Sequence, residues 1–197
     1  MNKTCVPSKD NLNSVGHMPM FVRKYEKMKK LIFRRLIAYG LDYIIVVAYA
    51  LFLFGVTVLL NVNELALTPV SGQFLGFISL TLPVFLYFFL SERGSRSATI
   101  GKRIMNISVC SQSDNGNPRI FQRNILKFLP WEIAHTGVHW IVFYSKYEND
   151  VPIWVWTLLI LPQIIMVIYL FSIIASKGES SIYDKIANSR IKITSVQ

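Results

Sequence analysis

Residues 153–176 read IWVWTLLILPQIIMVIYLFSIIAS and contain no charged side chain. A transmembrane helix needs about 20 consecutive apolar residues to cross a hydrocarbon core about 30 Å thick. Two further runs meet or approach that length: residues 36–60, with a single charge at Asp42, and residues 73–90, with none. A chain of 197 residues has too little polar surface to solvate three such helices in a soluble domain. The sequence therefore predicts an integral membrane protein.

The composition agrees with a membrane setting and excludes several other classes. Charged residues make up 16% of the chain and hydrophobic residues 52%, against about 25% charged in a typical soluble domain. That apolar content excludes a disordered chain, and two cysteines are too few for a disulfide-stapled domain. Residues 94–103 lack the spacing and the hydroxyl of a phosphate-binding loop, and no HExxH motif or nucleophile–base pair is readable. We therefore expect neither an enzyme nor a bound cofactor.

A fourth run, residues 128–144, is weaker because it contains Pro130, Glu132 and two histidines, and its length gives only about 25 Å of helix. It could span, re-enter or lie along the interface. Lys and Arg number nine in residues 1–35, none in 61–72, seven in 91–127, one in 145–152 and four in 177–197. This alternation follows the positive-inside rule for four spans with both termini cytoplasmic. We therefore expect an all-α, multi-pass protein of the plasma membrane with spans at 36–60, 73–90, 128–144 and 153–176.

The polar segments suggest some further organisation. Residues 1–30 read as a basic cytoplasmic tail, and residues 31–195 as the membrane domain. Residues 103–109 alternate between polar and apolar, a turn signal follows at 113–117, and a short strand at 119–121 would close a small cytoplasmic β-hairpin in the middle loop. Residues 190–194 alternate as well and are a candidate third strand. No internal repeat is detectable, which argues against an inverted-repeat transporter.

Asp42 is the charge that the first span must accommodate. A carboxylate in hydrocarbon is costly, so it should face the bundle interior with a partner or a proton. Arg35 lies seven residues earlier, which places both side chains on one helix face about 10 Å apart. Asp42 is either an exchangeable functional group or a structural charge that fixes packing.

Glu132, His135 and His139 lie at i, i+3 and i+7 and share one face of the fourth predicted span. They could line an ion or proton path, because histidine exchanges protons near neutral pH. They could instead make hydrogen bonds between helices or anchor the helix at the interface. A metal site would need more ligands than the other spans offer, so we predict no metal.

Three stretches resemble motifs of the RDD family of membrane proteins. Residues 35–42, RLIAYGLD, resemble its R-x-x-A-x-x-x-D motif, and residues 99–103, TIGKR, resemble its T-x-G-K-R loop. Residues 181–191 resemble its closing motif, commonly H-D-x-x-A-G-T-x-V, with Tyr183 in place of the histidine and Asn188-Ser189 in place of Gly-Thr. The resemblance covers about residues 30–195 and implies functional positions at Arg35, Asp42, Asp184, Thr99, Gly101 and Lys102.

The resemblance also implies a polytopic fold and two kinds of function. One is transport of an ion or small solute, including cation–proton exchange, with Asp42 as the exchangeable carboxylate and Arg35 as its gate or counter-charge. The other is a membrane scaffold or assembly factor that docks a cytoplasmic partner. Asp184 follows the last span, where we expect direct or water-bridged contact with Arg35; a helix-capping carboxylate is the alternative.

The expected partners follow from the same features. The basic stretch 23–35 directly precedes a span, so it favours anionic lipid of the inner leaflet over nucleic acid. A monovalent cation or proton would be the transported species. Four spans are few for a complete pathway, so we expect a homo-oligomer or a membrane partner protein.

Overall fold

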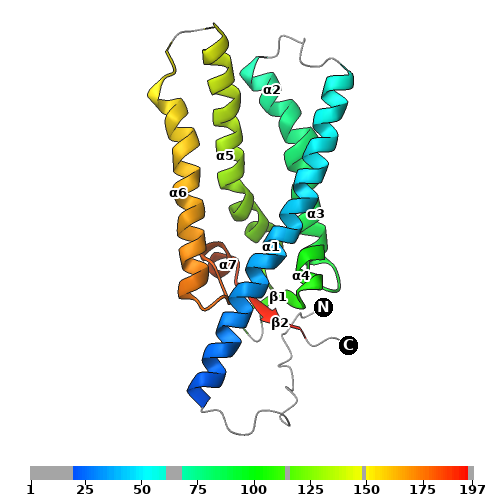
Figure 1. Cartoon of the computed structure of the whole chain (residues 1–197), viewed down its shortest axis with the longest axis vertical. Coiled ribbons are helices and arrows are strands. Elements are labelled where there is room, and N and C mark those ends of the chain that lie inside the picture. Colours follow the sequence, from blue (N-terminus) through cyan, green and yellow to red (C-terminus); the bar gives the residue numbers. More distant parts are fainter. Residues whose placement is uncertain (1–19, 61–67, 114–115, 148–149, 195–197) are drawn as a thin grey trace. The chain divides into compact units, whose positions relative to one another are not determined.

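The computed structural model describes residues 20–60, 68–113, 116–147 and 150–194; residues 1–19 of the predicted tail lie outside these ranges. Within these ranges the chain is mostly helical, with two short strands (Figure 1). In order, the elements are α1 (Met20–Leu59), α2 (Pro69–Gly76), the π-helical turn η2 (Phe77–Thr81), α3 (Leu82–Arg93), α4 (Ile100–Ile104), β1 (Ile107–Ser111), α5 (Ile120–Tyr147), α6 (Ile153–Ala175), α7 (Ile182–Ile186) and β2 (Ser189–Ile193).

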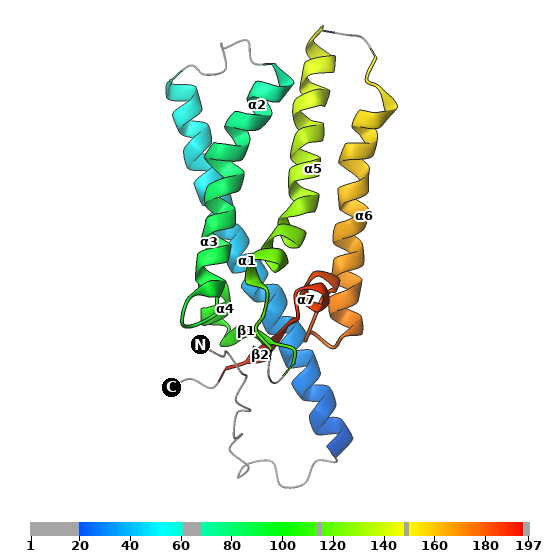
Figure 2. The same cartoon turned by 180° about the vertical axis from the view of Figure 1, so that it is seen from behind.

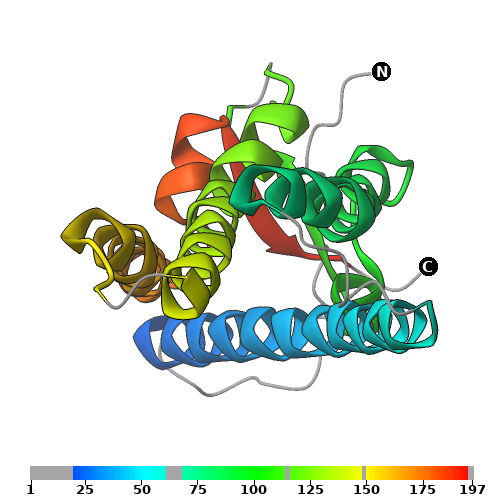
Figure 3. The ribbon, with the colours of Figure 1, turned by 90° about the horizontal axis from the view of Figure 1, so that it is seen from above.

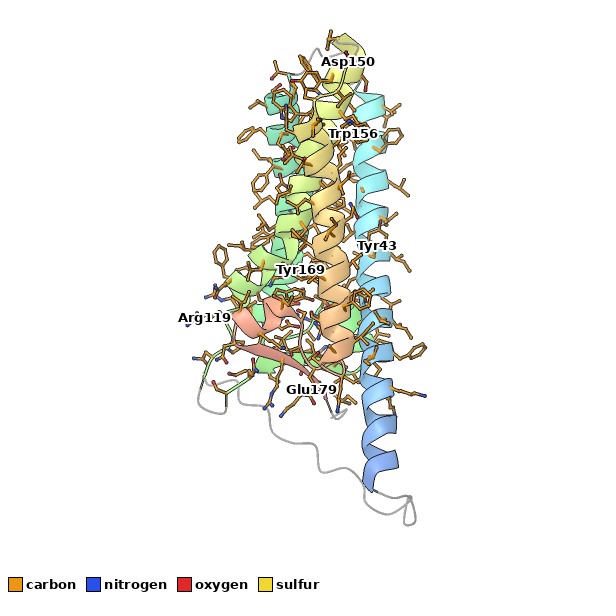
Figure 4. The ribbon with its side chains drawn as sticks, turned by 90° about the vertical axis from the view of Figure 1, so that its left-hand side faces the viewer. Tyr43, Arg119, Asp150, Trp156, Tyr169 and Glu179 are labelled. Atoms are coloured by element: carbon orange, nitrogen blue, oxygen red, sulfur yellow. The ribbon has the colours of Figure 1, made fainter. Side chains whose placement is uncertain are left out.

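Three helical segments of the described chain are long and apolar enough to cross a membrane: Lys29–Leu59, Pro69–Arg93 and Ile153–Ala175. They contain the predicted span at 73–90 and all but the last residue of those at 36–60 and 153–176. Few of their side chains are buried, and Trp156 of α6, labelled in Figure 4, is one of the exposed ones. Helices solvated by lipid are expected to look like this. The fourth predicted span, residues 128–144, lies within the single 28-residue helix α5.

The chain divides into two units. The first comprises the chain up to Asp42, Phe89–Arg123 and Tyr169 to the C-terminus; the second comprises Tyr43–Phe88 and Asn124–Ile168. Helix α1 runs unbroken from one unit into the other (Figure 3). The buried apolar core of the first unit is formed by Leu31, Ala38, Ile107, Val109, Ile120 and Ile191. In the second unit, the rings of Phe85 and Phe88 pack edge-on against Phe128.

The sheet differs from the predicted one. β1 pairs antiparallel with β2, from Ile107 opposite Ile193 to Ser111 opposite Ser189. The predicted β-hairpin in the middle loop is therefore wrong, because Ile120 and Phe121 begin α5 instead of forming a strand. The alternation at 190–194 does form a strand, and its partner is β1. Burial explains the choice: β2 supplies Ile191, which is as deeply buried as Ile107 and Val109.

The structure also contradicts the expectation of no internal repeat. The segment that follows α3 and the segment that follows α6 have the same local structure. Each residue of the first corresponds to the residue 82 positions later in the second, as Thr99 corresponds to Ser181. Thr99 and Ser181 are the N-caps of two five-residue helices, and both side chains accept a hydrogen bond from the third helical N–H. Asn106 and Asn188 then take positive φ angles of 53° and 49°, and a five-residue strand follows each.

The hydrogen bonds repeat in the same way. Val109 N donates to Ser97 O at 2.9 Å, and the matching Ile191 N donates to Glu179 O at 2.7 Å. Val109 and Ile191 also lie opposite each other in the sheet, so a local two-fold axis passes through this pair. Figures 1 and 2 agree with it, since α4 lies on one side of the sheet and α7 on the other. The repeat is readable in hindsight as TIGKRIMN at 99–106 and SIYDKIAN at 181–188.

Candidate functional site

Asp42 is held by the start of α4. Its side chain is buried and accepts hydrogen bonds from Thr99 Oγ1 at 2.6 Å and from Gly101 N at 2.9 Å. The first backbone N–H groups of a helix have no partner inside the helix and carry a partial positive charge. The carboxylate of Asp42 therefore caps α4, and the loop motif is the element that receives it.

Gly101 permits this contact because α4 approaches the backbone of α1. A Cβ atom on Gly101 would lie 2.2 Å from Ala38 O and 3.0 Å from Asp42 Oδ1. Ala38 itself is fully buried, which agrees with a small residue at a close helix crossing. The close approach of the two backbones thus leaves no room for a side chain at Gly101 of the loop motif.

Arg35 and Asp184 form the predicted contact. Arg35 Nη2 lies 2.5 Å from Asp184 Oδ2, and both side chains are completely buried. Arg35 also donates to Gly178 O at 3.0 Å and to Tyr39 Oη at 3.0 Å. Asp184 at the same time makes a capping box with Ser181 at the start of α7. Both alternatives for Asp184, ion-pair partner and helix cap, are therefore present together.

Two further charged residues extend this pair, and sequence reasoning missed both. Arg123 Nε donates to Asp184 Oδ1 at 2.7 Å, and Arg123 Nη1 donates to Glu92 Oε2. Lys102 Nζ donates to the other oxygen of Glu92. The result is a buried chain of alternating charge that runs Arg35–Asp184–Arg123–Glu92–Lys102, here called the charge chain. The sequence contains one indication that Glu92 is paired. Residues 91–127 contain seven basic residues and only two acidic ones, of which Glu92 is one.

The electrostatics of the charge chain favour its ionised form at Asp184. Burial alone would raise the pKa of this carboxyl, but Arg123 and Arg35 hold the pKa well below its usual range. Burial lowers the pKa of Lys102, and Glu92 opposes this only in part. With Asp42, the three cations are balanced by three carboxylates whose oxygens all accept hydrogen bonds. This arrangement fixes structure and leaves no carboxylate oxygen free for a ligand.

The second unit contains a different kind of polar cluster, on α2 and α5. Gln73 Nε2 donates to Glu132 Oε1, and the rings of His135 and His139 lie 4.8 Å apart between centroids. Two glycines of α2 face these rings: a Cβ on Gly72 would lie 3.0 Å from His139 Nδ1, and one on Gly76 would lie 2.6 Å from His135 Cε1. The predicted trio is therefore brought together, and Gln73 joins it from the neighbouring helix.

This cluster is less completely hydrogen-bonded than the charge chain, where Arg123 Nη2 is the one buried side-chain atom without a hydrogen-bond partner among the described residues. Four of its buried atoms have no hydrogen-bond partner among the described residues: Gln73 Oε1, Glu132 Oε2, His135 Nδ1 and His139 Nε2. A buried polar atom without a partner costs about 1–3 kcal/mol. The described residues contain no group of three or more His, Cys, Asp or Glu side chains that could hold a metal ion. The cluster thus offers donors and acceptors to a proton, a small cation or a polar solute.

Long apolar helices, a small sheet and buried polar groups within the helices define a helical membrane protein. The chain belongs to the RDD family, whose model matches residues 30–188. Neither the curated proteins nor the solved structures include a significant match to it.

Replacing Gly101 tests the close crossing of α4 and α1. Gly101→Ala should lower the free energy of unfolding by about 1–3 kcal/mol, since the added methyl must displace backbone. The matched control is Gly40→Ala on α1, where a Cβ would meet nothing within 4 Å and alanine should be neutral or slightly stabilising. Thermal unfolding of the purified protein in detergent measures both. Equal midpoints for the two variants would refute the space requirement.

Asp184→Asn tests the charge chain and its pH dependence. The amide leaves two buried guanidinium groups without their carboxylate, so we expect a loss of about 3–5 kcal/mol at pH 7. Because the folded pKa of Asp184 is depressed, its stabilisation is present above its unfolded pKa of about 4 and is lost as pH falls through the folded pKa. The stability difference between wild type and variant should therefore hold from pH 7 to 5 and narrow only in stronger acid.

The exposed Glu179, labelled in Figure 4, provides the control for this series. Glu179→Gln removes a nearby carboxylate that lies outside the charge chain, so its stability should follow wild type at each pH. The assignment of Asp184 as an ionised member of the charge chain would be contradicted by either of two results. One is equal stability of wild type and Asp184→Asn at pH 7, and the other is a stability difference that stays constant down to pH 2.

Proposed function

We propose that this RDD protein is a four-span plasma-membrane protein that exchanges protons or a monovalent cation at the cluster of Gln73, Glu132, His135 and His139. The observation that carries the proposal is the set of four buried polar atoms on α2 and α5 that have no hydrogen-bond partner within the described part of the chain. Ionisable groups inside membrane helices are expensive to retain and are a mark of ion and proton pathways. The proposal includes no enzymatic step and no cofactor.

The pairing of the strands supports four spans. β1 ends at Ser111 and β2 begins at Ser189, and only α5 and α6 separate them apart from short connections and α7. Strands that pair must lie on the same side of the membrane. If α6 crosses alone, they lie on opposite sides, so the pairing favours a second crossing by α5. Its 28 residues give about 42 Å of helix, which is long enough.

The same reasoning applies to the first half of the chain. Asp42 in α1 bonds to Thr99 and Gly101, which follow α3, so the chain between them should cross an even number of times. The candidate spans at Lys29–Leu59 and Pro69–Arg93 supply two crossings. Together with the distribution of Lys and Arg, this supports both termini in the cytoplasm.

The chemistry of the cluster suits exchange. The free oxygen of Glu132 can take either a cation or a proton, and this mutual exclusion is the simplest coupling between the two. The imidazole rings next to it carry nitrogens that can accept or donate a proton. Gly72 and Gly76 keep the side of α2 that faces the rings free of side chains.

The geometry moves the exchange role away from Asp42. Both oxygens of Asp42 are engaged by α4, and those of Asp184 by Arg35 and Arg123. We therefore assign Arg35, Asp42 and Asp184 the task of holding α4 and α7 in place.

A membrane scaffold or assembly factor is the second candidate. It is supported by basic residues of the first unit that are exposed and lie outside the charge chain, including Arg93, Arg96, Arg119 and Lys177. These could dock an acidic cytoplasmic protein. A homo-oligomer or a membrane partner is compatible with either function.

Flux measurements on purified protein in liposomes distinguish the two functions. Wild type should move protons in response to a sodium or potassium gradient, and Glu132→Gln should reduce that flux at least tenfold because the amide cannot titrate. Asp150→Asn, which neutralises an exposed carboxyl outside the cluster, is the matched control and should retain the flux. Asp42→Asn should lower the yield of folded protein more than the flux per folded molecule. No flux in wild type, or full flux in Glu132→Gln, would overturn exchange at this site.

A further inference from the structure

The repeat within the first unit carries a second surface, formed by α4 and α7. The two helices have the same burial pattern: the first, fourth and fifth residues are exposed, and the second and third are buried. The buried pairs are Gly101-Lys102 and Tyr183-Asp184, which belong to the contacts with α1 and to the charge chain. Each helix is therefore fixed by one face and leaves the other uncovered.

The uncovered faces match each other chemically. Ile100 and Ile104 of α4 are 45% and 60% exposed, and the matching Ile182 and Ile186 of α7 are 37% and 48% exposed. For comparison, Ile44 on α1 is 64% exposed, and Ile104 comes nearest to it. Isoleucines four residues apart lie on the same side of a helix, so each face presents two of them together.

An exposed basic residue accompanies each isoleucine pair, Arg103 in α4 and Lys185 in α7. These two residues occupy the same position of the repeat, and neither takes part in the charge chain. An apolar helix face with a cation at its edge is typical of helices that lie at the boundary of acyl chains and anionic headgroups.

The position of both helices in the chain agrees with this setting. α4 begins seven residues after α3 ends at Arg93, and α7 begins seven residues after α6 ends at Ala175. Both α3 and α6 belong to candidate membrane spans. The two short helices are therefore tied closely to points where the chain leaves the membrane.

We infer that α4 and α7 are a matched pair of interfacial helices that bind an anionic lipid leaflet, with the isoleucines in the acyl region and Arg103 and Lys185 on the phosphates. The two contacts are related by the local two-fold axis through Val109 and Ile191. The inference depends on the chain being a membrane protein and is independent of ion exchange, so either can fail without the other.

Quenching by brominated lipid tests the contact directly. The full chain, with Cys5 and Cys110 replaced, is labelled with a fluorophore at Ile104→Cys or Ile186→Cys and reconstituted in phosphatidylcholine vesicles that contain phosphatidylglycerol. Gln112→Cys and Thr194→Cys are the matched controls, because they are exposed and are also equivalent in the repeat. Lipid brominated on its acyl chains should quench the labels at 104 and 186 several times more strongly than those at 112 and 194.

The role of the basic residues is tested by brominating either phosphatidylglycerol or phosphatidylcholine. The ratio of quenching by the two lipids measures the preference for the anionic one. Arg103→Gln should lower this preference about fivefold at label 104, and Lys185→Gln should do the same at label 186. Lys146→Gln removes an exposed charge elsewhere on the chain and should change neither. Equal quenching at all four labels, or an unchanged preference in the charge variants, would overturn the inference.

Discussion

The ion pair between Arg35 and Asp184 is the interaction on which the rest of the first unit depends. Both groups are fully buried, so each would be costly without the other. Arg123 and Glu92 carry the pairing on to Lys102, while Asp42 separately caps α4. Segments from five parts of the chain are thereby tied together, and each of them must lie on the same side of the membrane.

This arrangement separates two tasks within one small protein. The RDD motif residues satisfy each other and stabilise α4, α7 and the sheet. The α2–α5 cluster keeps unpaired polar atoms, which is what an exchangeable proton or cation requires. The third helical residue breaks the local two-fold symmetry, since it is Lys102 in α4 and Asp184 in α7. That difference in sign lets one charge chain join both halves of the repeat.

Much of this could be predicted from sequence because the signals are local. Hydropathy located three spans, and motif resemblance located Arg35, Asp42, Asp184 and the loop at Thr99. The strand partner could not be predicted, since alternation at 103–109 shows that a strand has a buried face but not which strand covers it. Glu92 and Arg123 were missed because their pairing joins residues distant in sequence. The repeat was missed because its buried positions differ, Gly101-Lys102 against Tyr183-Asp184, while caps and exposed isoleucines match.

Cysteine accessibility in intact cells tests the central claim, that the paired strands and the charge chain lie on one side of four spans. In a chain without its native cysteines, an impermeant thiol reagent should label Thr68→Cys and Asp150→Cys but not Gln112→Cys or Thr194→Cys until the membrane is opened. All four positions are exposed in the fold, so protection of a cysteine from the reagent would mean that the membrane blocks access to it. Labelling of only one of positions 112 and 194 in intact cells would contradict the account. β1 and β2 would then lie on opposite sides of the membrane and could not pair.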